Sequence, residues 1–189
     1  MESILFDLTD GVASITLNRP AVYNSFNCDM ALSLQHYLKE CSTNAKVRAI
    51  YLTGAGKAFC AGQDLQEAID PKGPGLTRIV GEHYNPIIEL IREIEKPIVG
   101  AVNGVAAGAG ANIALACDIT LAAESAYFMQ AFSKIGLIPD SGGTYILPRI
   151  VGRQRATALM MLAEKVPANE AVQMGMIYRA YPDEAFAEA

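Results

Sequence analysis

The hydrophobic and polar residues at the start of the chain predict two strands followed by a helix. Residues 4–8 and 12–17 alternate as strands do, and Asp10-Gly11 between them is typical of a hairpin turn. From residue 29 to residue 41 the apolar positions recur at helical spacing, and Asn27 or Asp29 could cap the helix. The predicted buried face of this helix consists of Met30, Leu34, Tyr37, Leu38 and Cys41.

The order of strand, small-residue loop and helix then recurs, which predicts an α/β fold with parallel strand connections. The segment 70–75 (DPKGPG) is expected to be a flexible loop within a single domain that spans residues 1–189. Further strands are predicted at 47–52, 97–102, 119–122 and 177–181. Further helices are predicted at 84–94, around 113–116, and at 144–151, 155–163 and 169–174.

Composition and charge narrow the class of protein. With 189 residues, of which 51% are hydrophobic and 19% charged, the chain can bury a sizeable core. A net charge of −5 disfavours a nucleic-acid-binding surface, which is normally basic. The first residues lack a signal-peptide pattern, and no apolar run reaches the roughly 18 residues of a membrane span. A cytoplasmic protein that binds neither nucleic acid nor membrane is therefore expected.

The usual metal-binding and nucleophilic residues form no recognisable site. The four cysteines have no CxxC spacing and no neighbouring histidine pair, so neither a metal nor a disulfide is expected, and a reducing compartment is favoured. His36 and His83 are expected at the surface or in packing, and Cys60 in packing. Ser25 and Ser141 have no recognisable base partner, which disfavours a serine hydrolase.

Two loops rich in small residues each follow a predicted strand. The first spans 57–65 (KAFCAGQDL) and the second 104–112 (GVAAGAGAN). Small side chains let a ligand approach the main chain, so backbone N–H groups there could bind an anion or a developing oxyanion. Tight turns and close packing would explain the same composition. Residues 54–57 (GAGK) superficially suggest a phosphate loop, but they fail its template, because Tyr51 stands where the first glycine belongs and Ala58 replaces the Ser/Thr. The second loop lacks the dinucleotide-binding glycine order.

Asp140 is the candidate acid or base. It lies in GLIPDSGGTYILP (136–148), between a proline and a Ser-Gly-Gly turn, among apolar and small residues. Desolvation raises the pKa of a carboxyl group and makes its ionised form a better base near neutral pH. Proton transfer in a dry pocket is therefore the functional interpretation of this residue.

Four segments together resemble the crotonase superfamily, also called the enoyl-CoA hydratase/isomerase family. They are residues 15–27, 56–65, 96–119 and 131–156, in the family's order and at its spacing. The resemblance implies a crotonase-like spiral of repeated ββα units that assembles as a homotrimer or a hexamer. It implies an acyl-CoA thioester substrate and no separate cofactor, since coenzyme A is part of the substrate. It also implies that residues 1–189 are the family's core domain without its C-terminal helical region.

The resemblance also implies roles for individual residues. Asp140 matches the catalytic aspartate of members that move double bonds. The backbone N–H groups of Gln63 and Ala109 match the pair that holds the thioester oxygen. The other positions implied to contact coenzyme A or the acyl group are Ala21, Val22, Tyr23, Ala61, Gly62, Asp64, Leu65, Gly108, Asn112 and Phe132.

The chain departs from the family's hydratases at two positions. Hydratases use two glutamates, and the corresponding positions here hold Asn112 and Phe132, neither of which transfers a proton as a carboxylate does. Isomerisation through a thioester enolate is therefore expected, with a ring-epoxide arylacetyl-CoA or a 3-enoyl-CoA as the substrate. Phe132, Ile135, Leu137 and Ile138 are expected to keep the pocket apolar. The alternatives are a hydratase of the same family and a catalytically silent acyl-CoA-binding protein.

Overall fold

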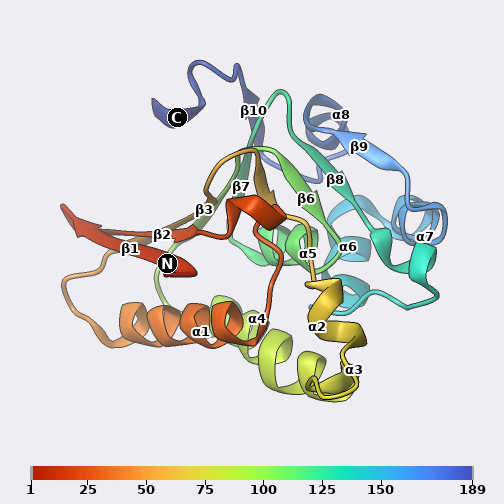
Figure 1. The fold of residues 1–189 in the computed structure, drawn as a ribbon. Coiled ribbons are helices and arrows are strands. Elements are labelled where there is room, and N and C mark those ends of the chain that lie inside the picture. Colours follow the sequence, from red (N-terminus) through yellow and green to blue (C-terminus); the bar gives the residue numbers. More distant parts are fainter. Residues whose placement is uncertain (1, 189) are drawn as a thin grey trace.

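The computed structural model of the protein describes residues 2–188, which form two β-sheets joined by helices (Figure 1). The larger sheet has the strand order β1-β2-β3-β5-β7-β10, and the smaller sheet has the order β4-β6-β8-β9. The strands of the larger sheet are β1 (Ile4–Thr9), β2 (Val12–Leu17), β3 (Ala49–Gly54), β5 (Ile98–Val102), β7 (Ile119–Ala123) and β10 (Arg179–Tyr181). Those of the smaller sheet are β4 (Ala58–Cys60), β6 (Val105–Ala107), β8 (Tyr127–Met129) and β9 (Lys165–Pro167).

The chain alternates between the two sheets, which produces a spiral of ββα units. Each of β3, β5 and β7 lies in the larger sheet, and the strand that follows it, β4, β6 or β8, lies in the smaller one. Helices follow each pair. The strand pairs β2·β3, β3·β5, β5·β7 and β7·β10 are parallel, whereas the hairpin β1·β2 is antiparallel. The predicted α/β fold with parallel connections and repeated ββα units is thus confirmed.

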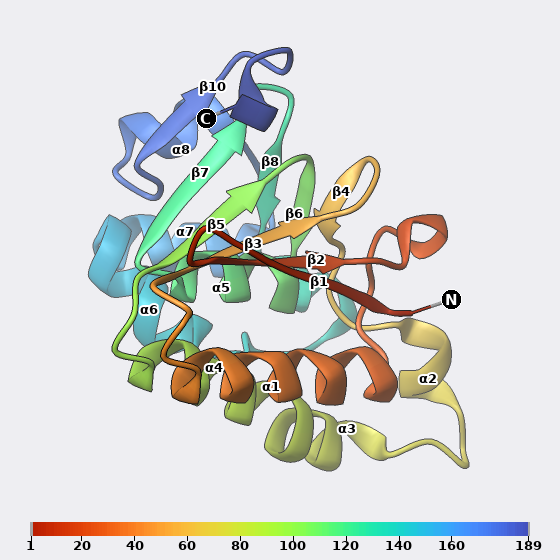
Figure 2. The same ribbon diagram turned by 90° about the vertical axis from the view of Figure 1, so that its left-hand side faces the viewer.

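The helices surround the sheets, and α5 occupies the centre. All eight residues of α5 are buried, and the helix contacts strands of both sheets. Figure 2 shows α1 and α4 along one face of the larger sheet. The α-helices are α1 (Cys28–Thr43), α2 (Leu65–Ile69), α3 (Gly75–Arg78), α4 (Asn85–Glu93), α5 (Ala109–Ala116), α6 (Gly143–Val151), α7 (Arg153–Leu162) and α8 (Ala168–Gln173). A π-helical stretch covers Ile79–Tyr84, and 3-10 turns cover Pro20–Val22, Ala131–Ile135 and Phe186–Glu188.

Helix α1 follows its sequence pattern closely. Asn27 is the N-cap, and its side-chain oxygen accepts a hydrogen bond from the N–H of Met30 (3.0 Å). On the predicted face, Tyr37 is only half-buried and stacks on Phe6 of β1, with ring centroids 4.7 Å apart. The residues of that face with no exposed surface are Met30, Leu34, Leu38 and Cys41.

Several predicted boundaries are wrong. The strand predicted at 47–52 occupies Ala49–Gly54, and the two predicted loops each begin with a three-residue strand, β4 and β6. These short strands, together with β8 and β9, are too brief to show a period, and β4 is buried on both faces, so it does not alternate. The helix predicted at 84–94 is the end of a longer helical segment that starts at Gly75. Two glycines in that extension dilute its apolar pattern.

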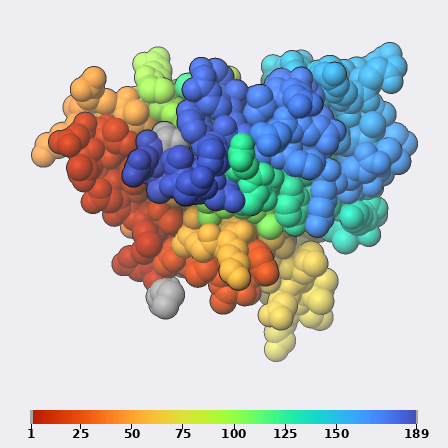
Figure 3. Space-filling model, turned by 90° about the horizontal axis from the view of Figure 1, so that it is seen from above, coloured from red at the N-terminus to blue at the C-terminus, as the bar shows by residue number. Residues whose placement is uncertain are grey.

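The end of the chain is tied to the larger sheet. The N–H of Glu124 donates to the carbonyl of Tyr181 (2.9 Å), and the Ser125 hydroxyl donates to the Asp183 carboxylate (2.8 Å). Seen from above, the residues after β10 form the middle of the surface, with N-terminal residues on one side and the α7–α8 region on the other (Figure 3). Within residues 2–188, no helix is long and apolar enough to cross a membrane.

Candidate active site

The two small-residue loops meet at the N-terminal end of α5, and glycine makes this contact possible. Gly62 has φ = 97°, and a Cβ atom there would lie 3.0 Å from the carbonyl oxygen of Ala107 and 3.6 Å from the nitrogen of Ala109. A Cβ atom on Gly110 would lie 2.3 Å from the carbonyl oxygen of Cys60. The first turn of α5 therefore packs directly against the main chain of β4, as the composition of both loops predicts.

We expect Gly110→Ala to force the two loops apart. The added methyl group would overlap backbone atoms, which cannot move aside as a flexible side chain can, and such overpacking costs about 1–3 kcal/mol. The free energy of unfolding, measured by denaturant melts, should fall by that amount, and turnover should fall with it. Gly81→Ala is the control, because nothing lies within 4 Å of its added Cβ. Equal stability of the two variants would contradict the close contact.

Two backbone N–H groups remain without a partner where the loops meet. The N–H of Phe26 donates to the carbonyl of Gly62 (2.7 Å) and that of Asp64 donates to the carbonyl of Phe26 (2.8 Å), so the ladder passes over Gln63. Ala109 is the first residue of α5, and the N–H groups of a first helical turn have no intrahelical acceptor. Within residues 2–188 neither N–H donates to a protein atom. Both are thus available to an oxyanion.

Asp140 lies in a tight, partly buried turn in front of α6. Its carbonyl oxygen accepts the N–H of Gly143 (2.9 Å), and its carboxylate accepts the hydroxyl of Ser141 (2.8 Å). Ser141 is buried and has φ = 49°, a conformation that non-glycine residues rarely adopt and that recurs at functional sites. Burial raises the pKa of the Asp140 carboxyl, and the Ser141 hydrogen bond opposes part of that rise.

Removing the Ser141 hydroxyl should shift the pH dependence of turnover in a definite direction. This hydroxyl hydrogen-bonds the ionised carboxylate, so Ser141→Ala should raise the pKa of Asp140 further. If Asp140 must be ionised to act as a base, the acid limb of the kcat/KM profile lies above the ordinary aspartate range in the wild type. In the variant that limb moves to still higher pH. Ser133→Ala, at an exposed serine of the neighbouring 3-10 turn, should leave the profile unchanged. An unmoved limb in Ser141→Ala would contradict this coupling.

Asn112 and Phe132 take up the positions where the resemblance places the hydratase glutamates. The Asn112 side chain is 1% exposed; its amide donates to the carbonyl of Asp140 (2.9 Å) and accepts from the Gln130 amide (2.8 Å). Asn112 was expected to contact the ligand, but its side chain faces the protein. The buried Phe132 ring lies near the second loop, 3.8 Å from where a Cβ on Gly108 would be. Neither residue brings a carboxyl group.

The first loop is held by a chain of side chains that the sequence did not reveal. The Tyr84 hydroxyl donates to the Gln63 amide oxygen (2.8 Å), and the Gln63 amide donates to the Glu67 carboxylate (3.0 Å), which also accepts the N–H of Cys28 (2.9 Å). Burial, with the neighbouring Cys60, Asp140 and Glu67, raises the pKa of Tyr84 well above its ordinary value. Tyr84 is on the π-helical stretch, 21 positions from Gln63, and no local pattern links them.

The segment expected to contact coenzyme A lies against the first loop. The N–H of Ala61 donates to the carbonyl of Tyr23 (2.9 Å), and Arg19 pairs with Asp64 (2.9 Å). The fully buried Asn24 side chain donates to the carbonyls of Ala55 and Ala58 (2.9 and 2.7 Å). The structure thereby brings residues 21–23 and 61–65 together at one surface. The large apolar side chains exposed there are Val22, Tyr23 and Leu65.

Other predicted residues are placed as follows. Cys60 is fully buried, and burial raises the pKa of its thiol to about 12, which fits the predicted packing role. His83 is buried and His36 is exposed. Among residues 2–188, no cluster of three or more metal-ligating side chains is present, and all four cysteines are free.

The predicted apolar pocket is wrong in two of its members. Ile135 is 55% exposed and Ile138 is 82% exposed, so they enclose nothing within this chain. Ile135 ends the 3-10 turn Ala131–Ile135, Gly136 follows it in a left-handed conformation, and Ile138 lies two residues further on. Leu137 is half-buried, and of the four residues only Phe132 is buried.

Comparison with known proteins identifies the family. The profile of the enoyl-CoA hydratase/isomerase family matches residues 7–189. The chain belongs to this family. The resemblance of the four sequence segments to the crotonase superfamily is therefore confirmed. A putative enoyl-CoA hydratase/isomerase from Mycobacterium abscessus has a similar structure, with a TM-score of 0.93 and 36% identity. The match covers 98% of this chain and 73% of that one. An enoyl-CoA hydratase from Bacillus anthracis matches with a TM-score of 0.91 and 34% identity over 98% of this chain and 72% of that one.

Two similar family members carry different descriptions. The chain is 48% identical to 1,2-epoxyphenylacetyl-CoA isomerase of Escherichia coli K12, over 100% of its own length and 73% of that protein. It is also 48% identical to a probable enoyl-CoA hydratase of Rhodobacter capsulatus, over 97% of its own length and 70% of that protein. Overall identity thus places the chain within the enoyl-CoA hydratase/isomerase family without separating isomerase from hydratase.

Proposed function

We propose that this family member is an acyl-CoA isomerase that works through a thioester enolate. Asp140 is the acid and base, and the N–H groups of Gln63 and Ala109 hold the thioester oxygen. The observation that carries the proposal is the Asp140 carboxyl group, whose pKa is raised by burial, together with Asn112 and Phe132 at the positions where a hydratase has its two acids.

The proposed reaction moves one proton and one double bond. In a 3-enoyl-CoA, the Asp140 carboxylate takes a proton from the α-carbon, and the electron pair spreads through the dienolate onto the thioester oxygen. The two N–H groups stabilise that charge without reorganising, because the loops already fix them. The Asp140 carboxylic acid then returns the proton to the γ-carbon, which yields the 2-enoyl-CoA and restores the carboxylate. No water is consumed, and one carboxyl group suffices.

A ring-epoxide thioester is the preferred substrate class. The 48% identity to the E. coli 1,2-epoxyphenylacetyl-CoA isomerase supports 1,2-epoxyphenylacetyl-CoA, which rearranges to the seven-membered oxepin-CoA without gaining or losing atoms. The oxyanion donors serve both reactions, since each substrate presents the same thioester oxygen. Coenzyme A would lie across residues 21–23 and 61–65, where main chain and exposed apolar side chains meet.

A panel of thioesters tests this proposal. We expect turnover of 1,2-epoxyphenylacetyl-CoA or a 3-enoyl-CoA, followed by product mass and by the rise of enoyl absorbance, and little loss of enoyl absorbance with crotonyl-CoA. Rapid hydration of crotonyl-CoA would favour the hydratase, which the R. capsulatus relative keeps as the second candidate. Tight binding of every ester without any turnover would instead support a silent acyl-CoA-binding protein.

We also propose that the protein assembles as a homotrimer or hexamer. Several large apolar side chains on and near α6 and α7 are exposed in the single chain, and burial in an interface would remove them from water. They are Ile135, Ile138, Tyr145, Met161 and Leu162. Sedimentation equilibrium should give a mass of three or six chains, and a monomer at all concentrations would contradict this assembly.

A further inference from the structure

A line of buried amides connects the interior of the protein to the backbone of Asp140. The Gln130 amide group donates to the Asn112 oxygen, and the Asn112 amide group donates to the Asp140 carbonyl. Asn112 and Gln130 are 1% and 4% exposed, so solvent does not compete for these bonds. The line spans three parts of the fold: the end of β8, helix α5 and the turn before α6.

The Asp140 carbonyl at one end of this line fixes which amide group donates and which accepts in both hydrogen bonds. The Asp140 carbonyl oxygen can only accept, so Asn112 must turn its NH₂ group toward it. The Asn112 oxygen then faces Gln130, which must donate a hydrogen bond to it through its own NH₂ group. Rotating either amide by half a turn would place two donors or two acceptors together. The three residues are thus locked in one arrangement.

The Asn112 amide lies against Gly143, in space that a side chain at position 143 would occupy. A Cβ atom at Gly143 would lie 2.3 Å from the Asn112 nitrogen, so any larger residue would displace the amide. The Asp140 carbonyl also accepts the N–H of Gly143. Asn112 therefore fills the space that the glycine leaves. Its amide donates to the same Asp140 carbonyl oxygen that accepts the N–H of Gly143, the first residue of α6.

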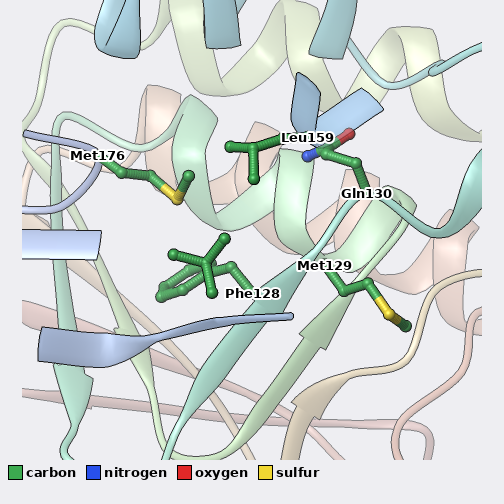
Figure 4. A pocket seen from close by; sticks show the side chains of 6 residues that line it. Phe128, Met129, Gln130, Leu159 and Met176 are labelled. Carbon is green, nitrogen blue, oxygen red and sulfur yellow. The ribbon is translucent and has the colours of Figure 1, made fainter. Parts of the chain in front are cut away.

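The inner end of the line leaves a carbonyl oxygen without a hydrogen bond. The Gln130 side-chain oxygen is buried and has no partner within residues 2–188. Gln130 borders a cavity of about 10 Å³ among Phe128, Met129, Leu159, Val166 and Met176 (Figure 4). This space is apolar and at most the size of one water molecule. The Gln130 amide supplies the hydrogen bond that the buried Asn112 oxygen needs, so Gln130 holds Asn112 in the orientation that reaches Asp140.

We propose that Asn112 and Gln130 are positioning residues that hold Asp140 at the reacting carbons, an inference that rests on the function proposed above. Proton transfer is sensitive to displacement of the base by an ångström or less. The Asp140 turn contains Ser141 in a strained, left-handed conformation and would relax if released. The amide line opposes that relaxation from the buried side.

Gln130→Met is the principal test. Methionine matches the length of glutamine, and the variant exchanges the unpaired oxygen of Gln130 for an unpaired oxygen on Asn112, so thermal stability should change little. We expect kcat to fall about 10- to 100-fold, with unchanged affinity for an acyl-CoA substrate analogue. Asn112→Ala should lower kcat by a similar factor. Thr120→Val is the control, since it removes a buried hydrogen bond to the other end of α5 and should leave kcat unaltered.

The Asp140→Asn background separates positioning from general damage. If the amide line acts only through Asp140, adding Gln130→Met to Asp140→Asn should leave the residual rate unchanged. A full further loss in that background would overturn the inference, as would wild-type kcat in folded Gln130→Met, or an equal loss in Thr120→Val. An inactive Asp140→Asn beside a fully active Gln130→Met would reject this inference and keep the proposed function. An active Asp140→Asn would reject both.

Discussion

Replacing Asp140 with asparagine is expected to lower kcat by about 10²–10⁴-fold, the usual contribution of a positioned acid or base. Asparagine keeps the size of the side chain and can still accept the Ser141 hydroxyl, but it cannot take a proton from carbon. Acyl-CoA affinity should remain, because the groups proposed to hold the thioester oxygen and coenzyme A lie elsewhere. Steady-state turnover and equilibrium binding of a substrate analogue measure the two quantities separately.

Asp118→Asn provides the matched control for this change. Asp118 is also an aspartate near the end of α5, where its carboxylate accepts the N–H of Ile98 (2.9 Å), far from any proposed proton transfer. Its variant should keep wild-type kcat. Wild-type turnover in Asp140→Asn, or an equal loss in both variants, would contradict the assignment of Asp140.

The same substitution should stabilise the folded protein at neutral pH. Because burial raises the folded-state pKa of Asp140, the unfolded chain releases this proton at lower pH, and stability falls as pH rises from the unfolded to the folded pKa. Asparagine carries no such proton. The melting temperature of Asp140→Asn should therefore exceed that of the wild type at neutral pH, and the excess should vanish at a pH below both pKa values. A higher melting temperature of Asp140→Asn would therefore exclude unfolding as the cause of lost turnover.

Ala109→Pro is expected to reduce kcat by about 10²–10³-fold, the loss that usually follows removal of one oxyanion donor. Proline lacks the N–H, and position 109 is the first residue of α5, where a helix tolerates proline best. The preceding residue, Gly108, accommodates the restriction that proline places on it more readily than a residue with a side chain would. Turnover and circular dichroism together report the lost donor and the retained helix.

Ala109→Gly separates the donor from the side chain. Glycine retains the N–H and removes only a methyl group that is 4% exposed, so kcat should stay within about an order of magnitude of the wild type. If both variants lose turnover equally, the methyl group matters and the N–H does not. A folded Ala109→Pro with wild-type kcat would show that this amide does not hold the oxyanion.

The sequence predicted those parts of the fold whose own residues contain the signal. The 3.6-residue period of α1, its Asn27 cap and the Asp10-Gly11 hairpin are local, and the structure contains each of them. Strands β4 and β6 have three residues apiece, and their pairing is decided by neighbours distant in sequence. Sequence could find their small residues and suggest a site, but not their strands.

The residues of the candidate site, too, were predictable where their signal is local and were missed where it is not. Asp140 is conspicuous as an acid in an apolar segment, and the free N–H groups follow from the glycine-rich loops. The sequence marked Asn112 only because it stands where a hydratase has a glutamate. Its hydrogen bond to Asp140 spans 28 positions and its partner Gln130 lies in no motif, so neither bond could be predicted. Tyr84 was missed for the same reason, since it lies 21 positions from Gln63. Glu67 lies only four positions from Gln63, so its bond had a local signal, but nothing in the sequence marked that pair as part of a site.

Hydrogen exchange at the α-carbon of an acyl-CoA in deuterated water tests the central claim most directly, because it records enolate formation without requiring a particular product. We predict that the wild-type protein exchanges the α-hydrogen of a bound thioester and that Asp140→Asn binds the same thioester with no detectable exchange. Exchange at equal rates in both proteins, or none in the wild type despite binding, would contradict the account.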